Sequence, residues 1–140
     1  MIMNKLVFIV EDNPVDQKVL ELHFKQTLGD YAVKTFSNPD DMLSRLHEKP
    51  FAIVLDHFFG DQSEKTGLHY LRELRKRHST VPVVYYTTLD DQSVRKEVMQ
   101  LGIEQYIIKD SASLVRLRTA LDALLAKKSK KGFLQKLFSR

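Results

Sequence analysis

The chain has 140 residues, of which 43% are hydrophobic and 29% are charged, values typical of a single globular domain. It contains no cysteine, which excludes a disulfide scaffold, a thiolate metal centre and a cysteine nucleophile. The net charge of +4 comes from residues 127–140, which hold six of the 22 basic residues and no acidic residue. We therefore expect a mildly acidic domain over 1–126 and a basic tail over 127–140.

Apolar runs along the chain are short. The longest of them, such as Leu6 to Val10, have five residues, whereas a helix that crosses a membrane needs about 20. The first run is also too short for the apolar core of a secretory signal, so we expect a cytoplasmic protein. The chain has no helix-turn-helix pattern and no zinc finger, so its basic tail is weak support for nucleic-acid binding.

Strand patterns and helix patterns alternate along the chain. In order, the first half predicts a strand over 6–10, a helix from Pro14 to Gly29, a strand over 31–36, a helix from Asn38 to about Lys49 and a strand over 51–55. The second half predicts a loop over 57–66, a helix from Gly67, a strand over 82–86, a helix ending at Gly102, a strand over 105–108 and a helix over 114–124. Strands joined by helices of this length run parallel, with helices on both faces of an α/β sheet.

Helix starts carry recognisable signals. Pro14 and Pro39 stand where the first turn of a helix tolerates proline, with Asp12 or Asn13 as the cap before the first and Asn38 before the second. The last helix shows the clearest apolar stripe of the chain, at 114, 117, 121 and 124, with Ser111 or Ser113 as its expected cap.

Charged and hydroxyl side chains follow most of the predicted strands. Glu11 and Asp12 follow the first strand, Asp56 the third, Thr87 the fourth and Lys109 the fifth. Ligands of open α/β sheets bind outside the carboxyl ends of the strands, where these residues would meet. Grouped carboxylates repel one another, and a hard divalent cation such as Mg²⁺ relieves that repulsion.

These residues, in the segments VFIVEDNPVD, FAIVLDHF, VPVVYYTTLDD and LGIEQYIIKD, resemble the receiver domain of two-component response regulators over about residues 4–126. The resemblance implies a flavodoxin-like three-layer α/β/α sandwich with five parallel strands in the order 2-1-3-4-5. It also implies that Asp56 is the nucleophile that becomes an aspartyl phosphate. Glu11, Asp12, Asp56 and the backbone carbonyl of Phe58 would bind Mg²⁺, and Lys109 would neutralise the phosphoryl oxygens.

The resemblance implies a conformational switch as well. Thr87 would donate its hydroxyl to a phosphoryl oxygen and draw the following loop inward, while the rotamer of Tyr106 changes with it. Two positions tune the lifetime of the phosphoryl group in this family, and here they are Phe58 and Leu89. Both are apolar, so we expect them to hinder the attacking water and to slow dephosphorylation.

The chain departs from the family in two places. Family members commonly have a proline four residues after the phosphorylated aspartate and a glycine eight residues after it. Here Gly60 stands at the first position and Gly67 follows Asp56 by eleven residues, so we infer about three extra residues within 61–66. The second departure is Lys109-Asp110, where the family has Lys-Pro with a cis peptide bond. A cis bond before a non-proline residue costs about 3–4 kcal/mol, so we expect a trans bond here.

Each residue also has an ordinary explanation. Glu11 and Asp12 could cap a helix, Asp56 could occupy a turn, and Lys109 could be a solvated strand end. Taken together at successive strand ends, however, they favour the functional interpretation. The five histidines lack metal-ligand spacing, and we expect each to be a surface or packing residue, including His57 beside Asp56.

The tail combines lysines with paired apolar residues. Residues 127–131 predict a solvated, flexible segment, whereas Phe133, Leu134, Leu137 and Phe138 recur at helical spacing. So short a helix is marginal alone. Contact of residues 131–140 with an anionic membrane or a partner groove, docking on the domain and disorder all remain open.

The leading functional hypothesis is a stand-alone receiver that accepts a phosphoryl group from a histidine kinase or phosphotransfer protein and signals to another protein by contact. It would catalyse only its own phosphorylation and dephosphorylation, it would lack a DNA-binding domain, and its active form could pair into a dimer. Two alternatives are a receiver-like adaptor that works without phosphorylation, and a small phosphatase or flavin-binding protein with the same fold.

Overall fold

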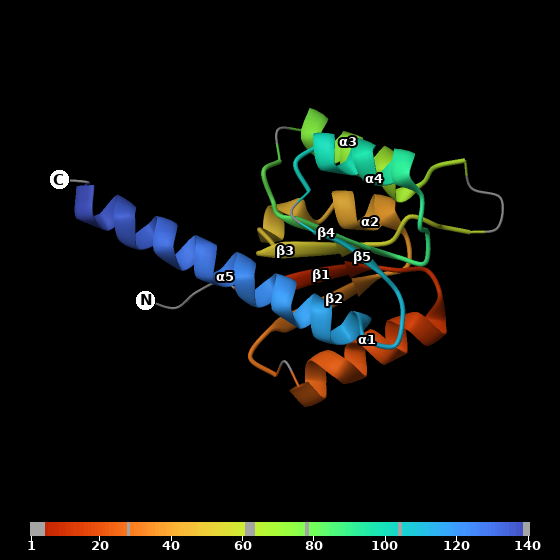
Figure 1. The fold of residues 1–140 in the computed structure, drawn as a ribbon, viewed down its shortest axis with the longest axis horizontal. Helices are drawn as coiled ribbons and strands as arrows, with labels where there is room; N and C mark the ends of the chain where they lie inside the picture. Colours follow the sequence, from red (N-terminus) through yellow and green to blue (C-terminus); the bar gives the residue numbers. More distant parts are fainter. Residues whose placement is uncertain (1–4, 28, 61–63, 78, 104, 139–140) are drawn as a thin grey trace.

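The structure is a computed structural model that describes residues 5–27, 29–60, 64–77, 79–103 and 105–138 (Figure 1). Five strands form one sheet: β1 (Leu6–Val10), β2 (Ala32–Phe36), β3 (Ala52–Leu55), β4 (Val83–Thr87) and β5 (Gln105–Ile108). They are all parallel and lie in the order β2-β1-β3-β4-β5, which confirms the expected fold and strand order. The carboxyl ends of the five strands therefore meet along one border of the sheet, called the carboxyl edge below.

Helices cover both faces of this sheet (Figure 1). One face carries α1 (Pro14–Thr27) and α5 (Ser113–Phe138), and the other carries α2 (Pro39–Leu43), α3 (Gly67–Lys76) and α4 (Gln92–Gln100). The alternation of side chains along β1 divides the core between the two faces. Val7 and Ile9 pack in the cluster under α1 and α5, while Phe8 and Val10 pack in the cluster under α2, α3 and α4. Because both faces of the sheet are covered, successive residues of a strand are buried, and the strand is a continuous apolar run in the sequence.

Hydrogen bonds identify the caps of the first two helices. Asn13 Oδ1 accepts from the backbone N–H of Val15 at 2.9 Å before α1, and Asn38 Oδ1 accepts from that of Asp40 at 2.8 Å before α2. Ser113, one of the two expected caps of α5, is instead the first residue of that helix, and its hydroxyl donates to the carbonyl of Asp110 at 2.9 Å.

The second predicted helix is shorter than expected. It ends at Leu43, and a 3₁₀ helix, η1 (Leu46–Glu48), follows it. Lys49 then adopts a left-handed conformation, with φ of 56°, which ends the helical path before β3. The apolar periodicity of the segment does not reveal this change in helix type.

The last helix is longer than expected. It runs without a break from Ser113 to Phe138, so residues 127–131 are helical rather than an irregular, flexible link. Lysine is a good helix former, and a solvent-exposed helix interior tolerates Gly132 at a modest cost. The part from Lys127 to Phe138, called the α5 extension below, projects past the sheet on the side opposite the carboxyl edge (Figure 1). Within the described ranges, no helix is both long and apolar enough to cross a membrane.

Candidate functional site

The carboxyl edge gathers the polar residues that follow the strands. Glu11 and Asp12 follow β1, Asp56 follows the adjacent β3, and Lys109 follows β5. The backbone N–H of Lys109 donates to the carbonyl of Thr87 at 2.8 Å, which continues the pairing of β4 and β5 and fixes where the lysine side chain begins.

Lys109 is the centre of a buried ion cluster. Its Nζ lies 2.6 Å from Glu11 Oε2 and 3.0 Å from Asp56 Oδ2. Only 13% of the Lys109 side chain is exposed, and the two carboxylates are almost fully buried. Charges this deeply buried are stable only when they are paired, so the three side chains hold one another in place.

A fourth charged residue joins the cluster, and the sequence interpretation missed it. Asp16 Oδ2 lies 3.1 Å from Lys109 Nζ, from the first turns of α1. The sequence signal was weak: Asp16 is the third residue of α1 and follows Glu11 by five residues, which places it near the carboxyl edge without pointing it to Lys109. Asp16 is more exposed than Glu11 and Asp56 and occupies the solvent side of the ammonium group.

Backbone amides hold the remaining carboxylate oxygens. Asp56 Oδ1 accepts from the N–H of His57 at 2.6 Å, and Glu11 Oε1 accepts from that of Asn13 at 3.1 Å. Asp12 Oδ2 accepts from the N–H of Gly60 at 2.5 Å, which ties β1 to the loop after β3. Each carboxylate therefore has a defined orientation.

Burial and neighbouring charge shift two pKa values in the cluster. Burial raises the pKa of Glu11 to about 7, the contact with Asp56 adds to the increase, and Lys109 opposes it. Burial alone would lower the pKa of Lys109, but its hydrogen bond to Glu11 and the charge of Asp56 outweigh that effect and raise it. Lys109 therefore stays positively charged at neutral pH.

The two expected switch residues both contact Leu89 in the loop after β4. The hydroxyl oxygen of Thr87 accepts from the N–H of Leu89 at 3.2 Å, and the hydroxyl of Tyr106 donates to the carbonyl of Leu89 at 2.5 Å. Thr87 is fully buried, and the Tyr106 ring stacks on that of Tyr85 with centroids 5.4 Å apart. Arg95 covers the Tyr106 ring, with its guanidinium carbon 4.5 Å from the centroid.

The loop after β3 is closed at its base. The N–H of Gly67 donates to the carbonyl of His57 at 2.8 Å. A Cβ added at Gly67 would lie 2.1 Å from the carbonyl oxygen of Asp56, so only glycine fits here. The extra residues expected within 61–66 fall partly on 61–63, which lie outside the described residues. Phe58, the first exposed residue of the loop, has 48% of its surface accessible.

Two further predictions concern single groups. The Lys109–Asp110 peptide bond is trans, as expected where aspartate replaces proline. His57 is a buried packing residue, as expected, because its ring nitrogen Nδ1 lies 2.6 Å from the hydroxyl of Tyr85.

The donor chemistry of the carboxyl edge suits a hard divalent cation, since carboxylates from β1 and β3 lie side by side. The carboxylate side chains, however, face different partners. Glu11 and Asp56 face Lys109, and Asp12 faces Gly60. Across the described ranges, no three acidic or histidine side chains converge as a ready-made metal site. A cation would therefore compete with Lys109 and Gly60 for these oxygens.

Comparison with known proteins identifies a family. Residues 7–122 match the response regulator receiver domain. A curated relative, the probable transcriptional regulator ycf27 of Guillardia theta, is 30% identical over 91% of this chain and 48% of its own length. The transcriptional regulatory protein YdfI of Bacillus subtilis is 28% identical over 79% of this chain and 50% of its own. The chain thus spans about half the length of the curated relatives it matches.

Solved structures show the same fold. The signal receiver domain of a putative Luxo repressor protein from Vibrio parahaemolyticus superposes with a TM-score of 0.80, at 18% identity, over 95% of this chain and 98% of that one. The BeF3-activated receiver domain of Klebsiella pneumoniae RstA has a TM-score of 0.68, at 26% identity, over 83% of this chain and 97% of that one.

Proposed function

Since the chain belongs to the response regulator receiver domain family, we propose that its Asp56 carboxylate accepts a phosphoryl group from a histidine kinase or phosphotransfer protein. The observation that carries the proposal is the contact of Lys109 Nζ with both Asp56 and Glu11 at the carboxyl edge. A buried nucleophilic carboxylate beside a fixed cation is the arrangement that phosphoryl transfer needs.

The reaction transfers one group between two partners. A carboxylate oxygen of Asp56 attacks phosphorus, the bond from phosphorus to the donor's histidine nitrogen breaks, and that nitrogen keeps the electron pair and takes up a proton. The N–H of His57 orients the carboxylate, and the ammonium of Lys109 balances the charge on the transferred oxygens. Glu11, Asp12, Asp56 and the carbonyl of Phe58 would hold Mg²⁺, which when bound supplies further positive charge to the phosphoryl oxygens.

The family is one of signalling domains rather than enzymes, and the only reaction we propose is the gain and loss of this phosphoryl group. The phosphorylated form then acts on a downstream protein by contact. The curated relatives are described as transcriptional regulators, which supports a role in signal response but does not define the partner.

The contacts of Leu89 suggest how the change spreads. The Thr87 hydroxyl accepts from the N–H of Leu89 in this structure. We propose that the Thr87 side chain moves toward the phosphoryl group when its hydroxyl donates to a phosphoryl oxygen, and that this movement pulls on the Leu89 amide. The carbonyl of Leu89 holds Tyr106, so movement of this loop also releases the tyrosine ring.

The stability of the phosphoryl group depends on access of water to Asp56. We propose that the apolar side chains of Phe58 and Leu89, which stand at the two positions that tune phosphoryl lifetime in this family, slow hydrolysis. In Phe58→Asn, the amide side chain would position a water, so we expect faster loss of phosphate than in the parent chain. Loss at the same or a slower rate would remove Phe58 from this role.

Intact mass spectrometry tests the central proposal. The full chain is incubated with Mg²⁺ and a small phosphodonor such as phosphoramidate, and we expect a gain of one phosphoryl group. Asp56→Asn should show no gain, whereas Asp41→Asn, which removes an exposed carboxylate on α2, should react like the parent. Absence of any gain in the parent chain would favour the adaptor that works without phosphorylation.

A further inference from the structure

The α5 extension exposes a row of large apolar side chains. Phe133 is 61% exposed, Leu137 55% and Phe138 83%, and Leu134 lies between them. Residues three and four apart share a side of a helix, so these four form one stripe. An exposed apolar cluster of this kind indicates a surface that binds a membrane or another molecule.

Half of the stripe is turned away from the core. Phe133 follows Leu124 by nine residues, about two and a half helical turns, which places it on the opposite side of α5. Phe138 instead follows Ala120 of the core cluster by eighteen residues, about five full turns, so it lies on the core-facing side of the helix. Because the continuous α5 projects past the sheet (Figure 1), the domain leaves both halves of the stripe exposed.

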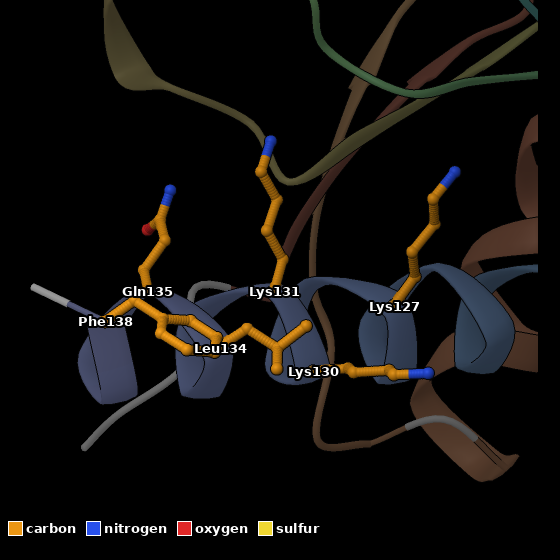
Figure 2. A pocket seen from close by; sticks show the side chains of 6 residues that line it. All are labelled: Lys127, Lys130, Lys131, Leu134, Gln135 and Phe138. Carbon is orange, nitrogen blue, oxygen red and sulfur yellow. The ribbon is translucent and has the colours of Figure 1, made fainter.

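Basic residues border the stripe. Figure 2 shows Lys127, Lys131 and Gln135 projecting to one side of the helix, with Leu134 and Phe138 beside them and Lys130 nearby. These residues surround a shallow hollow on the extension. Lys136 lies on the other side of the stripe, about 140° around the helix from Lys131. The segment 127–140 contains no acidic residue.

We propose that the α5 extension lies in the plane of an anionic phospholipid bilayer, with Phe133, Leu134, Leu137 and Phe138 inserted and the flanking lysines at the headgroups. Phenylalanine and leucine on one side of a helix with lysines on the other are typical of helices that bind at a membrane interface. Lysines on both borders match a flat surface, because their long stems reach the headgroups from either side.

Charge favours a bilayer over a second copy of the chain. A second copy of the extension would place lysines against lysines, with no acidic residue to pair them. An acidic protein groove would also pair the lysines, and the peptide experiment below distinguishes it from a bilayer. A flat surface can approach along the whole helix while the domain sits above it.

The carboxyl edge stays accessible in this arrangement. The extension leaves the domain on the side opposite the strand ends (Figure 1), so a bound membrane does not cover Asp56 or Lys109. Membrane binding and phosphorylation can therefore occur on the same molecule, and the proposal does not depend on the function proposed for Asp56.

Vesicle flotation tests the proposal with the full chain. We expect the parent to float with vesicles of phosphatidylcholine and phosphatidylglycerol, but not with phosphatidylcholine alone, and to be released at high salt. Leu137→Glu should reduce the floating fraction by about tenfold. Met99→Glu is the matched control, because Met99 is 52% exposed on α4 and the same charge is introduced.

A second pair of variants tests the charges. Replacing Lys130 and Lys131 with glutamine should weaken binding to the anionic vesicles by about tenfold, since each basic residue near the surface adds to the attraction. Replacing the exposed Lys18 and Lys25 of α1 with glutamine removes the same charge and should leave binding unchanged. Circular dichroism and thermal melting should be similar for all variants, because none of these residues is in the core.

Several results would overturn the proposal. The parent chain could fail to float with anionic vesicles at low salt, or Leu137→Glu could float like Met99→Glu. Sedimentation could show a dimer that Leu137→Glu dissociates while vesicles bind neither form, which would assign the stripe to a second copy. Binding of an acidic helical peptide, lost in Leu137→Glu and without vesicle binding, would assign it to a protein partner.

Discussion

The two ends of the sheet depart from ordinary burial in opposite ways. At the carboxyl edge, Glu11, Asp56 and Lys109 are charged and buried, whereas at the other end the α5 extension exposes Phe133 and Leu137. Charge is normally solvated, and large apolar clusters are normally covered. Buried charges and exposed apolar side chains both lower the stability of the fold. Such residues are therefore expected where a sequence is selected for function rather than for folding.

The largest contrast lies within α5 itself. Leu121 is fully buried in the core, and Leu137 belongs to the exposed stripe. We expect Leu121→Ala to lower the free energy of unfolding by about 2–5 kcal/mol, through lost burial and a cavity. Leu137→Ala should change it by less than about 0.5 kcal/mol. Urea unfolding measures both, and similar losses would mean that the extension packs on the domain.

The second contrast compares two lysines. Lys109→Gln leaves Glu11 and Asp56 buried without a cation, so we expect the free energy of unfolding to fall by about 2 kcal/mol in buffer without divalent ions. Lys136→Gln removes the same charge from the exposed extension and should have almost no effect. Urea unfolding of the two variants side by side tests this difference. An unchanged stability in Lys109→Gln would show that the ion cluster does not hold the carboxyl edge together.

The third contrast compares two glycines and predicts opposite signs. A methyl group at Gly67 meets the backbone carbonyl of Asp56, so we expect Gly67→Ala to destabilise the domain by about 1–3 kcal/mol. Nothing lies within 4 Å of a methyl group at Gly132, and alanine is the better helix former by up to about 1 kcal/mol. Gly132→Ala should therefore increase the helical signal in circular dichroism, and a decrease would contradict the continuous α5.

The smallest effect is a dependence on pH. The pKa of Glu11 is about 7 in the folded chain and about 4.3 in an unfolded one. Between these values the folded state binds more protons, so stability falls as pH rises. We expect the free energy of unfolding to decrease between pH 5 and about 7 and then to level off. This decrease should be absent in Glu11→Gln and present in Glu64→Gln, an exposed control. Urea unfolding between pH 5 and 8 without divalent ions measures it, and an equal slope in Glu11→Gln would exclude this origin.

Much of the fold could be predicted from local pattern. Residues 105–108 and the start of α3 at Gly67 were predicted correctly, because an apolar run between polar residues and a glycine after a polar loop are strong boundaries. The α5 extension was not predicted as part of a continuous helix, because lysines were interpreted by their charge rather than by their helix propensity. The 3₁₀ helix at 46–48 depends on packing that no periodicity records.

The site was predictable at the level of which strand ends meet. Parallel strands place Glu11, Asp56 and Lys109 at one edge once the strand order is known, and the structure brings them into contact. Asp16 could not be predicted from the strand ends, because it belongs to the helix turn beside them. The contacts of Leu89 could not be predicted, because they depend on the exact course of a loop.

The hydrogen bond from the N–H of Gly67 to the carbonyl of His57 holds the two ends of the loop over 57–66 together. Loop segments beyond such a closure are free to diverge, because added length there does not displace the chain on either side. Residues can therefore be gained or lost between the two ends while Asp56 keeps its position. Evolution, or a protein engineer who wishes to insert a recognition sequence, can therefore alter this loop beside Asp56, the proposed phosphoacceptor, without moving that residue.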